Sequence, residues 1–216
     1  MAAFGSGYRD VLITLSTQAV ISSNDDRSRI MDLATLKIAS TYCFPWAVNC
    51  TTLSPDKRML CVVGDSTETF IANADTGEVI TTLKGHIDYS FACCWSPDGR
   101  IVCTGNQDMT TRLYDTRNLS KAFCVLGAKL GAIRSLHFSA DGRYLAMAEP
   151  ADFVHIFDTN TFDRSQVIDL FGDIAGVNFT PDAQSLYIAN ADEAYGSILE
   201  YDVSNDCRNW MGHLTT

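Results

Sequence analysis

Residues 85–115 read GHIDYSFACCWSPDGRIVCTGNQDMTTRLYD, and this stretch decides the fold. Three short runs rich in Val, Ile, Phe, Tyr and Thr alternate in it with clusters of Gly, Pro, Asn and Asp. Such runs predict antiparallel strands joined by hairpins, because β-branched and aromatic side chains favour strands while the residues between them favour turns. A fourth run at 122–126 leads out of the unit. The stretch therefore predicts one four-stranded sheet.

The central turn of this unit recurs along the chain at a nearly constant spacing. Its copies are Ser54-Pro55-Asp56, Ser96-Pro97-Asp98, Ser139-Ala140-Asp141 and Thr180-Pro181-Asp182, and they lie 42, 43 and 41 residues apart. A dipeptide that closes each unit repeats independently and ends at Asp32, Asn73, Asp115, Asp158 and Asp202. Self-similarity at this period indicates one supersecondary unit copied along the chain.

The best-formed unit resembles a WD40 repeat in three places, which are Gly85-His86, Ser96-Pro97-Asp98-Gly99 and Leu113-Tyr114-Asp115, with Tyr in place of the usual Trp. The resemblance implies that each unit is one blade of a propeller. The predicted fold is all-β, a WD40-type β-propeller of about five four-stranded blades. We expect this propeller to be partial or open, with an incomplete first blade.

The repeat divides the chain into seven expected segments. These are an N-terminal segment with a partial-blade strand at 1–18, repeats at about 19–40, 41–83, 84–126, 127–170 and 171–203, and a C-terminal tail at 204–216. Individual stretches such as 43–49 and 147–155 are similar to the C-terminal portion of a little-characterised WD-repeat family of fungi and plants. Because a seven-bladed propeller needs about 300 residues, this similarity implies missing N-terminal blades or self-association through open sheet edges.

Well-formed WD40 blades contain a hydrogen-bonded tetrad of His, Ser or Thr, Asp and Trp. The resemblance places a structural tetrad here at His86, Thr104, Asp108 and Tyr114. The His, Asp and hydroxyl group also suggest a hydrolase superficially, but the structural role is favoured because the family's tetrad ties strands together. The other units depart from the motif, since Phe44 and Lys129 stand where the second and fourth units need His.

Propellers bind partners through the loops of one rim. The candidate partner-binding residues are Phe44, Trp46, Asp88, Tyr89, Asn106, Gln107, Lys129, Glu149, Pro150 and Asp173. Trp46 and Tyr89 rank first, because aromatic side chains dominate the energetics of interfaces. For two of these pairs a purely structural role stays open as an alternative to partner binding. Phe44 and Trp46 would fill the gap between two blades, and Glu149 with Pro150 would form a stiffened turn with an exposed carboxylate.

No pattern in the sequence supports catalysis or a bound metal. The four histidines are scattered, with only His137 and His155 in the same unit, and no HxxxH, HxH or CxxC spacing, GxSxG elbow or phosphate-binding GK[S/T] occurs. We therefore expect no enzymatic activity, no catalytic residues, no metal and no cofactor. A propeller hydrolase or lactonase, which needs acidic residues around a central channel, is the least favoured alternative.

The composition narrows the class of partner and the compartment. The chain of 216 residues carries a formal charge of −10, which disfavours a nucleic-acid partner. No apolar run approaches the ~20 residues that cross a bilayer, and residues 1–20 lack the pattern of a signal peptide, so no membrane partner is expected. The eight cysteines show no disulfide-like spacing and predict a reducing, intracellular location, cytoplasmic or nuclear.

These observations favour a non-catalytic scaffold for protein–protein interaction. The alternative is a substrate-recognition module that binds peptide motifs for a catalytic partner such as a ubiquitin ligase. A scaffold is expected to co-purify with stoichiometric subunits. A recognition module is expected to bind weakly, in a motif-dependent way that is lost on Trp46→Ala or Glu149→Ala.

Overall fold

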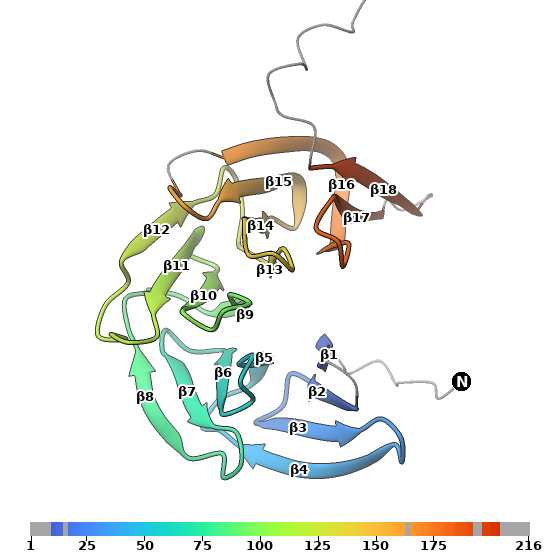
Figure 1. The fold of residues 1–216 in the computed structure, drawn as a ribbon. Helices are drawn as coiled ribbons and strands as arrows, with labels where there is room; N and C mark the ends of the chain where they lie inside the picture. The colour runs from blue at the N-terminus through green and yellow to red at the C-terminus, as the bar shows by residue number, and fades with distance from the viewer. Residues whose placement is uncertain (1–9, 15–16, 163–164, 192–195, 204–216) are drawn as a thin grey trace, which may run out of the picture.

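The computed structural model describes residues 10–14, 17–162, 165–191 and 196–203. Every helix or strand assigned in these residues is a β-strand, and the strands form sheets arranged in turn around a common axis (Figure 1). The first strand of each sheet lies near the axis and the last lies at the circumference, as β4, β8 and β12 show. This arrangement is that of a β-propeller.

Three of the sheets have four strands each, in chain order and antiparallel throughout. The first contains β1 (Asp10–Thr14), β2 (Gln18–Ser22), β3 (Arg27–Asp32) and β4 (Lys37–Cys43). The second contains β5 (Val48–Leu53), β6 (Met59–Gly64), β7 (Thr69–Asn73) and β8 (Val79–Leu83). The third contains β9 (Ser90–Trp95), β10 (Ile101–Asn106), β11 (Thr110–Asp115) and β12 (Cys124–Gly127).

The first sheet corrects the expectation of an incomplete first blade. β1 pairs with β2 over its whole length, from Asp10 opposite Ser22 to Thr14 opposite Gln18. The sequence predicts a single strand in the segment 1–18, and it is this strand that brings the first sheet to four.

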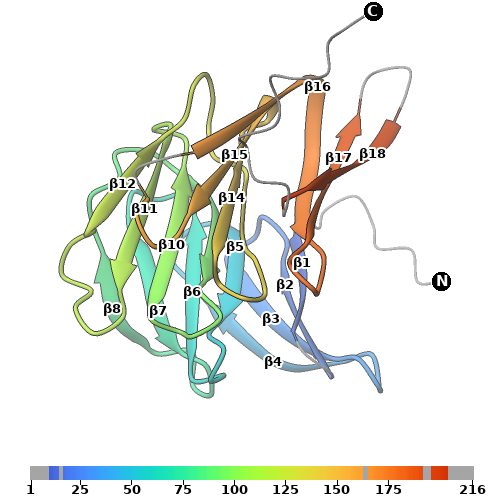
Figure 2. The same ribbon diagram turned by 45° about the horizontal axis from the view of Figure 1, so that its top comes forward.

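The last strands form one continuous six-stranded sheet. They are β13 (Ser135–Phe138), β14 (Tyr144–Ala148), β15 (Ala151–Asp158), β16 (Ser165–Phe179), β17 (Ser185–Ala191) and β18 (Gly196–Asp202). The sheet is continuous because the first half of β16 pairs with β15 and the second half with β17. Figure 2 shows the two halves running in different directions. β16 is therefore both the outer strand of the fourth blade and the inner strand of the fifth.

The recurring turn has the same hydrogen bonds in every copy. In the third blade, the Ser96 hydroxyl donates to Asp98 at 2.6 Å and accepts from the backbone N–H of Ile101 at 2.9 Å. The backbone N–H of Gly99 donates to the Ser96 carbonyl at 2.9 Å. The residue after the Asp has a positive φ in each copy, namely 63° at Lys57, 71° at Gly99, 73° at Gly142 and 59° at Ala183. The repeated sequence therefore specifies one left-handed turn between the first two strands of a blade.

The hydrophobic core lies between neighbouring sheets. Successive side chains of a strand point to opposite faces, so Tyr114 packs with Leu83 of the second sheet while Leu113 packs with Met147 of the fourth. All four side chains are at most 1% exposed. Burial of each contributes about 1.5–3 kcal/mol, so the contacts between blades supply much of the stability.

The ring of blades is not closed. The inner strands contact one another in succession, from β1 to β5, β5 to β9, β9 to β13 and β13 to β16. Within the described residues, no sheet joins the first blade to β17 or β18, which lie apart from it in Figure 1.

Candidate functional site

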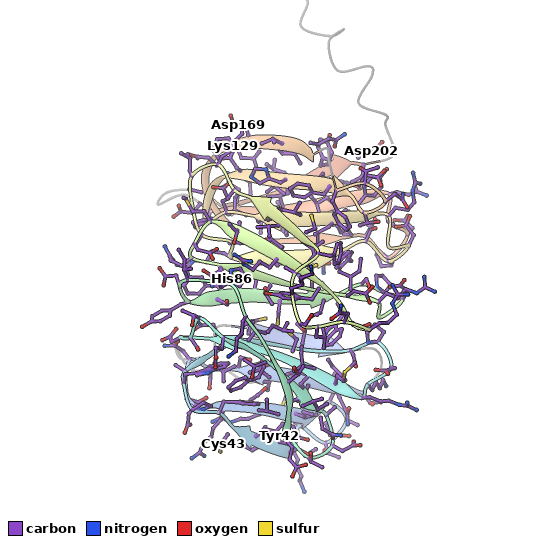
Figure 3. The ribbon with its side chains drawn as sticks, turned by 90° about the vertical axis from the view of Figure 1, so that its left-hand side faces the viewer. Tyr42, Cys43, His86, Lys129, Asp169 and Asp202 are labelled. Carbon is purple, nitrogen blue, oxygen red and sulfur yellow. The ribbon has the colours of Figure 1, made fainter. Side chains whose placement is uncertain are left out.

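Three loops on one rim of the third and fourth blades are bonded together through their backbones. They are residues 84–89, 107–109 and 128–134, and we call them the rim strip. The bonds run from the N–H of Gln107 to the carbonyl of Tyr89, from Ala128 to Met109 and from Ile133 to Asn106, at 2.8, 2.8 and 3.0 Å. Figure 3, which views the ring from its side, shows His86 and Lys129 of this strip on the same side of the blades.

A buried histidine anchors the first of these loops. His86 Nδ1 lies 2.8 Å from Asp108 and Nε2 lies 2.9 Å from the hydroxyl of Thr104. Burial lowers the pKa of His86 below its ordinary value, although Asp108 acts in the opposite direction. Because a carboxylate can only accept, the neutral ring donates from Nδ1 to Asp108 and accepts from Thr104 at Nε2.

Tyr114, the fourth residue of the expected tetrad, lies beside the hydrogen bonds that link Thr104, His86 and Asp108. The Tyr114 hydroxyl donates to the backbone carbonyl of Lys84 at 3.2 Å, where the loop begins. Burial raises the pKa of Tyr114 to about 12, so the phenol stays protonated and can donate. The structure thus brings the four residues together around one loop. Their role as a purely structural tetrad stays a prediction.

The fourth blade anchors its loop with a glutamate. The Glu149 carboxylate accepts from the backbone N–H groups of Lys129, Leu130 and Gly131, at 2.8, 2.8 and 2.6 Å. His155 Nε2 lies 2.7 Å from the same carboxylate. Burial raises the pKa of Glu149, but these bonds outweigh that effect and leave it below its ordinary value. Glu149 therefore takes the accepting role that Asp108 has in the third blade, and backbone N–H groups replace the histidine as donors.

Three candidate binding residues do not lie on exposed loops, contrary to the sequence-based expectation. Glu149 is 1% exposed, which corrects both the expected partner contact and the alternative of an exposed carboxylate. Asn106 is fully buried because its side-chain amide donates to the carbonyl of Asp88 and to Ser90. Asp173 is exposed but lies inside β16, whereas the sequence placed it in a loop.

Phe44 and Trp46 pack between the first two blades. Phe44 is buried, Trp46 is half-buried, and their ring centroids lie 6.1 Å apart in a stacked arrangement. The Trp46 ring also lies 5.2 Å from Phe70 of β7. This geometry agrees with the alternative in which the two side chains fill the gap between blades.

Other candidates do lie on the surface, and three apolar neighbours that the sequence did not single out lie with them. Asp88, Tyr89, Gln107, Lys129 and Pro150 are exposed. The exposed fractions are 82% for Ile87, 49% for Tyr89, 48% for Met109 and 68% for Leu130, and we call these four residues the rim patch. All four lie on the rim strip. The available signal was the occurrence of large apolar residues in turn segments, where polar residues are usual.

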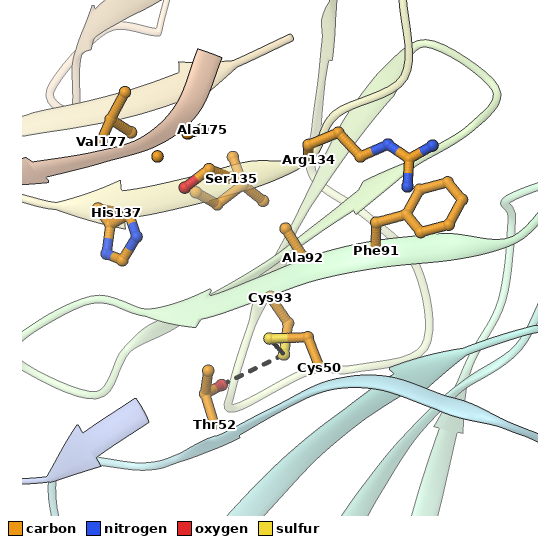
Figure 4. Close-up of a pocket in the computed structure, with 12 residues that line it drawn as sticks. Cys50, Thr52, Phe91, Ala92, Cys93, Arg134, Ser135, His137, Ala175 and Val177 are labelled. Atoms are coloured by element: carbon orange, nitrogen blue, oxygen red, sulfur yellow. Dashed lines mark hydrogen bonds between the residues drawn. The ribbon is translucent and has the colours of Figure 1, made fainter. Parts of the chain in front are cut away.

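A cavity of 220 Å³ opens where the inner strands of four blades meet (Figure 4). Its lining includes Cys50 and Cys93 of β5 and β9, Ser135 of β13 and Val177 of β16. The guanidinium of Arg134, the last residue of the rim strip, lies 3.7 Å above the ring centroid of Phe91 at this cavity. Among the described lining residues none is Asp or Glu, so this lining does not supply the acidic cluster that a propeller hydrolase needs.

Two cysteines of neighbouring blades meet inside the cavity. The Sγ atoms of Cys50 and Cys93 lie 3.8 Å apart, and Thr52 lies within 3.4 Å of the Cys93 sulfur (Figure 4). Burial raises the pKa of Cys93 well above its ordinary value. Within the described part of the chain, no group of three or more His, Cys, Asp or Glu side chains is placed to hold a metal ion.

Comparison with known families supports the repeat architecture. Residues 77–115 match the model of the WD domain, G-beta repeat. The matched span contains β8 of the second blade and β9, β10 and β11 of the third. Residues 131–169 match an uncharacterised protein domain, DUF2415, which spans parts of the fourth blade. The WD40 repeat and the open all-β propeller that the sequence predicts are thus confirmed.

Relatives are similar to this chain over different spans. An uncharacterised protein of Schizosaccharomyces pombe is 28% identical over 82% of this chain and 57% of its own length. The serine-threonine kinase receptor-associated protein of Gallus gallus is 30% identical over 38% of this chain and 23% of its own length. The periodic tryptophan protein 2 homolog of Schizosaccharomyces pombe is 24% identical over 74% of this chain and 18% of its own length. The chain therefore spans little more than half of the first of these relatives and under a quarter of the other two.

None of the described segments forms a helix of the length and apolar character needed to cross a bilayer.

Proposed function

We propose that this WD40-repeat chain is a non-catalytic platform that binds a partner protein through the rim patch. The observation that carries the proposal is the exposure of Ile87, Tyr89, Met109 and Leu130 on loops whose backbones are bonded to one another. Large apolar side chains held on a rigid surface favour association, because little conformational entropy is lost on binding.

The anchoring of the rim strip supports a binding role. His86 and Glu149, which could have served chemistry, are buried and engaged with the loops that carry the patch. Their geometry supports positioning of the loops. The charge of −10 makes a protein a better partner than nucleic acid.

We further propose an intracellular location in a reducing compartment. None of the seven cysteines of the described residues is in a disulfide, and four of them are buried as small apolar side chains. The Sγ atoms of two of the seven, Cys50 and Cys93, lie 3.8 Å apart at a hydrogen-bond distance and not in a disulfide. This pattern suits a compartment that keeps thiols reduced.

Affinity purification with a matched pair of variants tests the proposal. The tagged chain is expressed in its native cells, and captured proteins are quantified for wild type and for the double variant Ile87→Ser/Leu130→Ser. Loss of a hot-spot residue costs about 2 kcal/mol or more, which is about thirtyfold in affinity. We expect specific partners to be depleted to that extent.

The control replaces two exposed apolar side chains elsewhere by the same residue, serine. Val79 and Val125 are 47% and 50% exposed on β8 and β12 at the circumference, so Val79→Ser/Val125→Ser should leave the partners bound. Retention of all partners by the rim variant would contradict the proposal, as would capture of no protein by wild type above a tag-only control.

A further inference from the structure

Cys50 and Cys93 form a pair of thiols across the boundary between two blades. Cys50 lies in β5, the inner strand of the second blade, and Cys93 lies in β9, the inner strand of the third. Their sulfur atoms point toward one another in Figure 4, and the two Sγ atoms are 3.8 Å apart. Because the sulfur atoms of a disulfide are about 2.05 Å apart, a further approach of about 1.8 Å brings the pair to bonding distance.

Hydrogen bonds on both sides of the pair hold β5 and β9 together. The side-chain amide of Asn49 donates to the backbone carbonyl of Ser90 at 3.1 Å. The indole N–H of Trp95 donates to the backbone carbonyl of Thr52 at 3.2 Å. All four residues are buried. The cysteine pair lies between these two bonds along both strands, so its separation is set by the fold and does not depend on the position of a loop.

The cavity of 220 Å³ gives small molecules access to the pair. Cys50 and Cys93 both belong to its lining, and Cys50 is half-buried whereas Cys93 is 3% exposed. A cavity of only about 10–15 Å³ holds a water molecule, so this one has room for hydrogen peroxide, which is little larger. The cavity also leaves the Cys50 side chain space to rotate toward Cys93, which a close-packed core would not provide.

The other buried cysteines nearby do not share this access. Cys94 follows Cys93 in β9, but its side chain points to the opposite face and packs with Cys103, its register partner in β10. Cys61 of β6 packs in the same cluster as Cys93. Among the cysteines of the described residues, only Cys50 and Cys93 line the cavity. The short distance between sulfur atoms and the route for a small oxidant therefore coincide at this pair.

We propose that hydrogen peroxide converts Cys50 and Cys93 into a disulfide that links the second and third blades, and that cellular thiols reverse it. The bond needs no empty position at either sulfur, because it forms between two atoms that already contact one another. In the reducing compartment proposed above, it forms only while peroxide is abundant. This oxidation site goes beyond the proposed function and does not depend on the rim patch.

The reaction takes two steps, and each releases one water. Cys50 reacts first because it is the more exposed thiol, while burial raises the pKa of Cys93 well above its ordinary value and keeps it protonated. The Cys50 thiolate attacks one oxygen of the peroxide, the O–O bond breaks, and a sulfenic acid forms while the departing hydroxide takes a proton from solvent. The Cys93 sulfur then attacks the Cys50 sulfur, the S–O bond breaks, and the departing hydroxide takes the Cys93 proton. Two thiols and one peroxide thus give one disulfide and two waters.

Peptide mapping of the full chain tests the proposal. The protein carries Cys43→Ser, because Cys43 is exposed and shares the tryptic peptide 38–57 with Cys50. Native protein is treated briefly with hydrogen peroxide, unfolded in guanidinium with N-ethylmaleimide to block the remaining thiols, and digested without reduction. We expect peptide 38–57 to be joined to peptide 85–100, which contains Cys93 and Cys94. Because the native fold holds the two sulfur atoms together, this link should exceed that of any other cysteine pair by at least about tenfold.

Two adjacent residues provide a matched control. Cys93→Ala should abolish the link. Cys94→Ala removes a thiol that is also buried, in the same strand and the same peptide, and should leave the link in place. Glutathione added after the peroxide should restore both thiols. Thermal unfolding of each variant shows that the comparison concerns folded protein.

Three results would overturn the proposal. They are the absence of the link in native protein, a link that survives Cys93→Ala, and a link that is equally abundant when peroxide is added to protein already unfolded in guanidinium. Fragmentation spectra of the linked peptides distinguish Cys93 from Cys94 without either substitution, so the test remains decisive even if one variant fails to fold. The proposed function survives each of these results, because capture of partners by the rim patch is measured separately.

Discussion

Two buried carboxylates anchor neighbouring loops by different means. Asp108 bonds the side chain of His86, which the loop itself provides. Glu149 instead reaches three successive backbone N–H groups and is completed by His155 from β15. Backbone donors are present whatever the sequence of the loop. This explains how Lys129 can occupy the position of the missing histidine without loss of the anchor.

Replacement of Glu149 by Gln should destabilise the protein strongly. The amide cannot accept from all four donors, and its own NH₂ group faces backbone N–H groups in a buried site. Breaking such a charged network costs about 2–4 kcal/mol. We expect that decrease in the free energy of unfolding, measured by urea denaturation. The control Glu78→Gln changes an exposed glutamate and should have little effect.

The effect of Glu149→Gln should also depend on pH. Hydrogen bonds to the Glu149 carboxylate hold its pKa below its ordinary value of 4.5, despite burial. The ionised carboxylate therefore stabilises the folded state above pH 4.5, and this stabilisation is lost as the pH falls through the lowered pKa. The difference in stability between wild type and Glu149→Gln should shrink at acid pH. A constant difference would contradict the charged network.

The cysteines should differ widely in reactivity. Cys43 is exposed, whereas burial raises the pKa of Cys93 and Cys94 well above the ordinary value. Because the thiolate is the reactive form, N-ethylmaleimide should modify Cys43 more than about tenfold faster than either buried thiol. Peptide mass spectrometry after a short treatment measures this. All three should react in guanidinium, and equal rates in the native protein would contradict the described packing.

At the scale of elements, the turn between the first two strands of each blade is the most regular feature. The residue after the Asp adopts a left-handed conformation in all four copies, but it is glycine only at Gly99 and Gly142. Lys57 and Ala183 adopt the same conformation with a side chain, which costs more than it does for glycine. The hydrogen bonds of the neighbouring Ser or Thr and Asp suffice to hold the turn.

Lys57→Gly should therefore stabilise the second blade. Relief of the left-handed strain exceeds the added entropy of the unfolded chain, so we expect a gain of about 0.5–1 kcal/mol in the free energy of unfolding. The reciprocal variant Gly99→Ala should lose about 1 kcal/mol. A Cβ atom there would lie 3.8 Å from Pro55, an ordinary contact, so the loss would reflect φ alone. Denaturation curves measure both, and a loss on Lys57→Gly would contradict the argument.

At the scale of the whole molecule, the repeat predicts the fold because it is local. Hairpins, turns and the alternation of buried residues recur within about 42 residues, and each can be recognised from short stretches. The continuity of β16 could not be recognised in this way. It results from pairing with β15 and β17 on either side of Asp173, and such pairing has no signature in residues 165–179 themselves.

The candidate site was predicted only in part, for a related physical reason. Sequence identifies which loops gather on a rim, and the structure places His86, Asp108 and Tyr89 there. It does not reveal where a polar side chain finds its partners. Glu149 is buried because donors from a loop 18–20 residues away saturate it, whereas Ile87 is 82% exposed although its side chain is apolar.

The junctions between blades are not mechanically equivalent. Where residues 84–89 or 128–134 connect two sheets, the chain leaves one ladder before it enters the next, so those blades are joined by loop anchors and by packed side chains. The last two blades share a backbone ladder as well, since β16 pairs with β15 on one side of Asp173 and with β17 on the other. A change in the angle between these two blades would therefore have to break or bend strand hydrogen bonds, which is not required at the other two junctions.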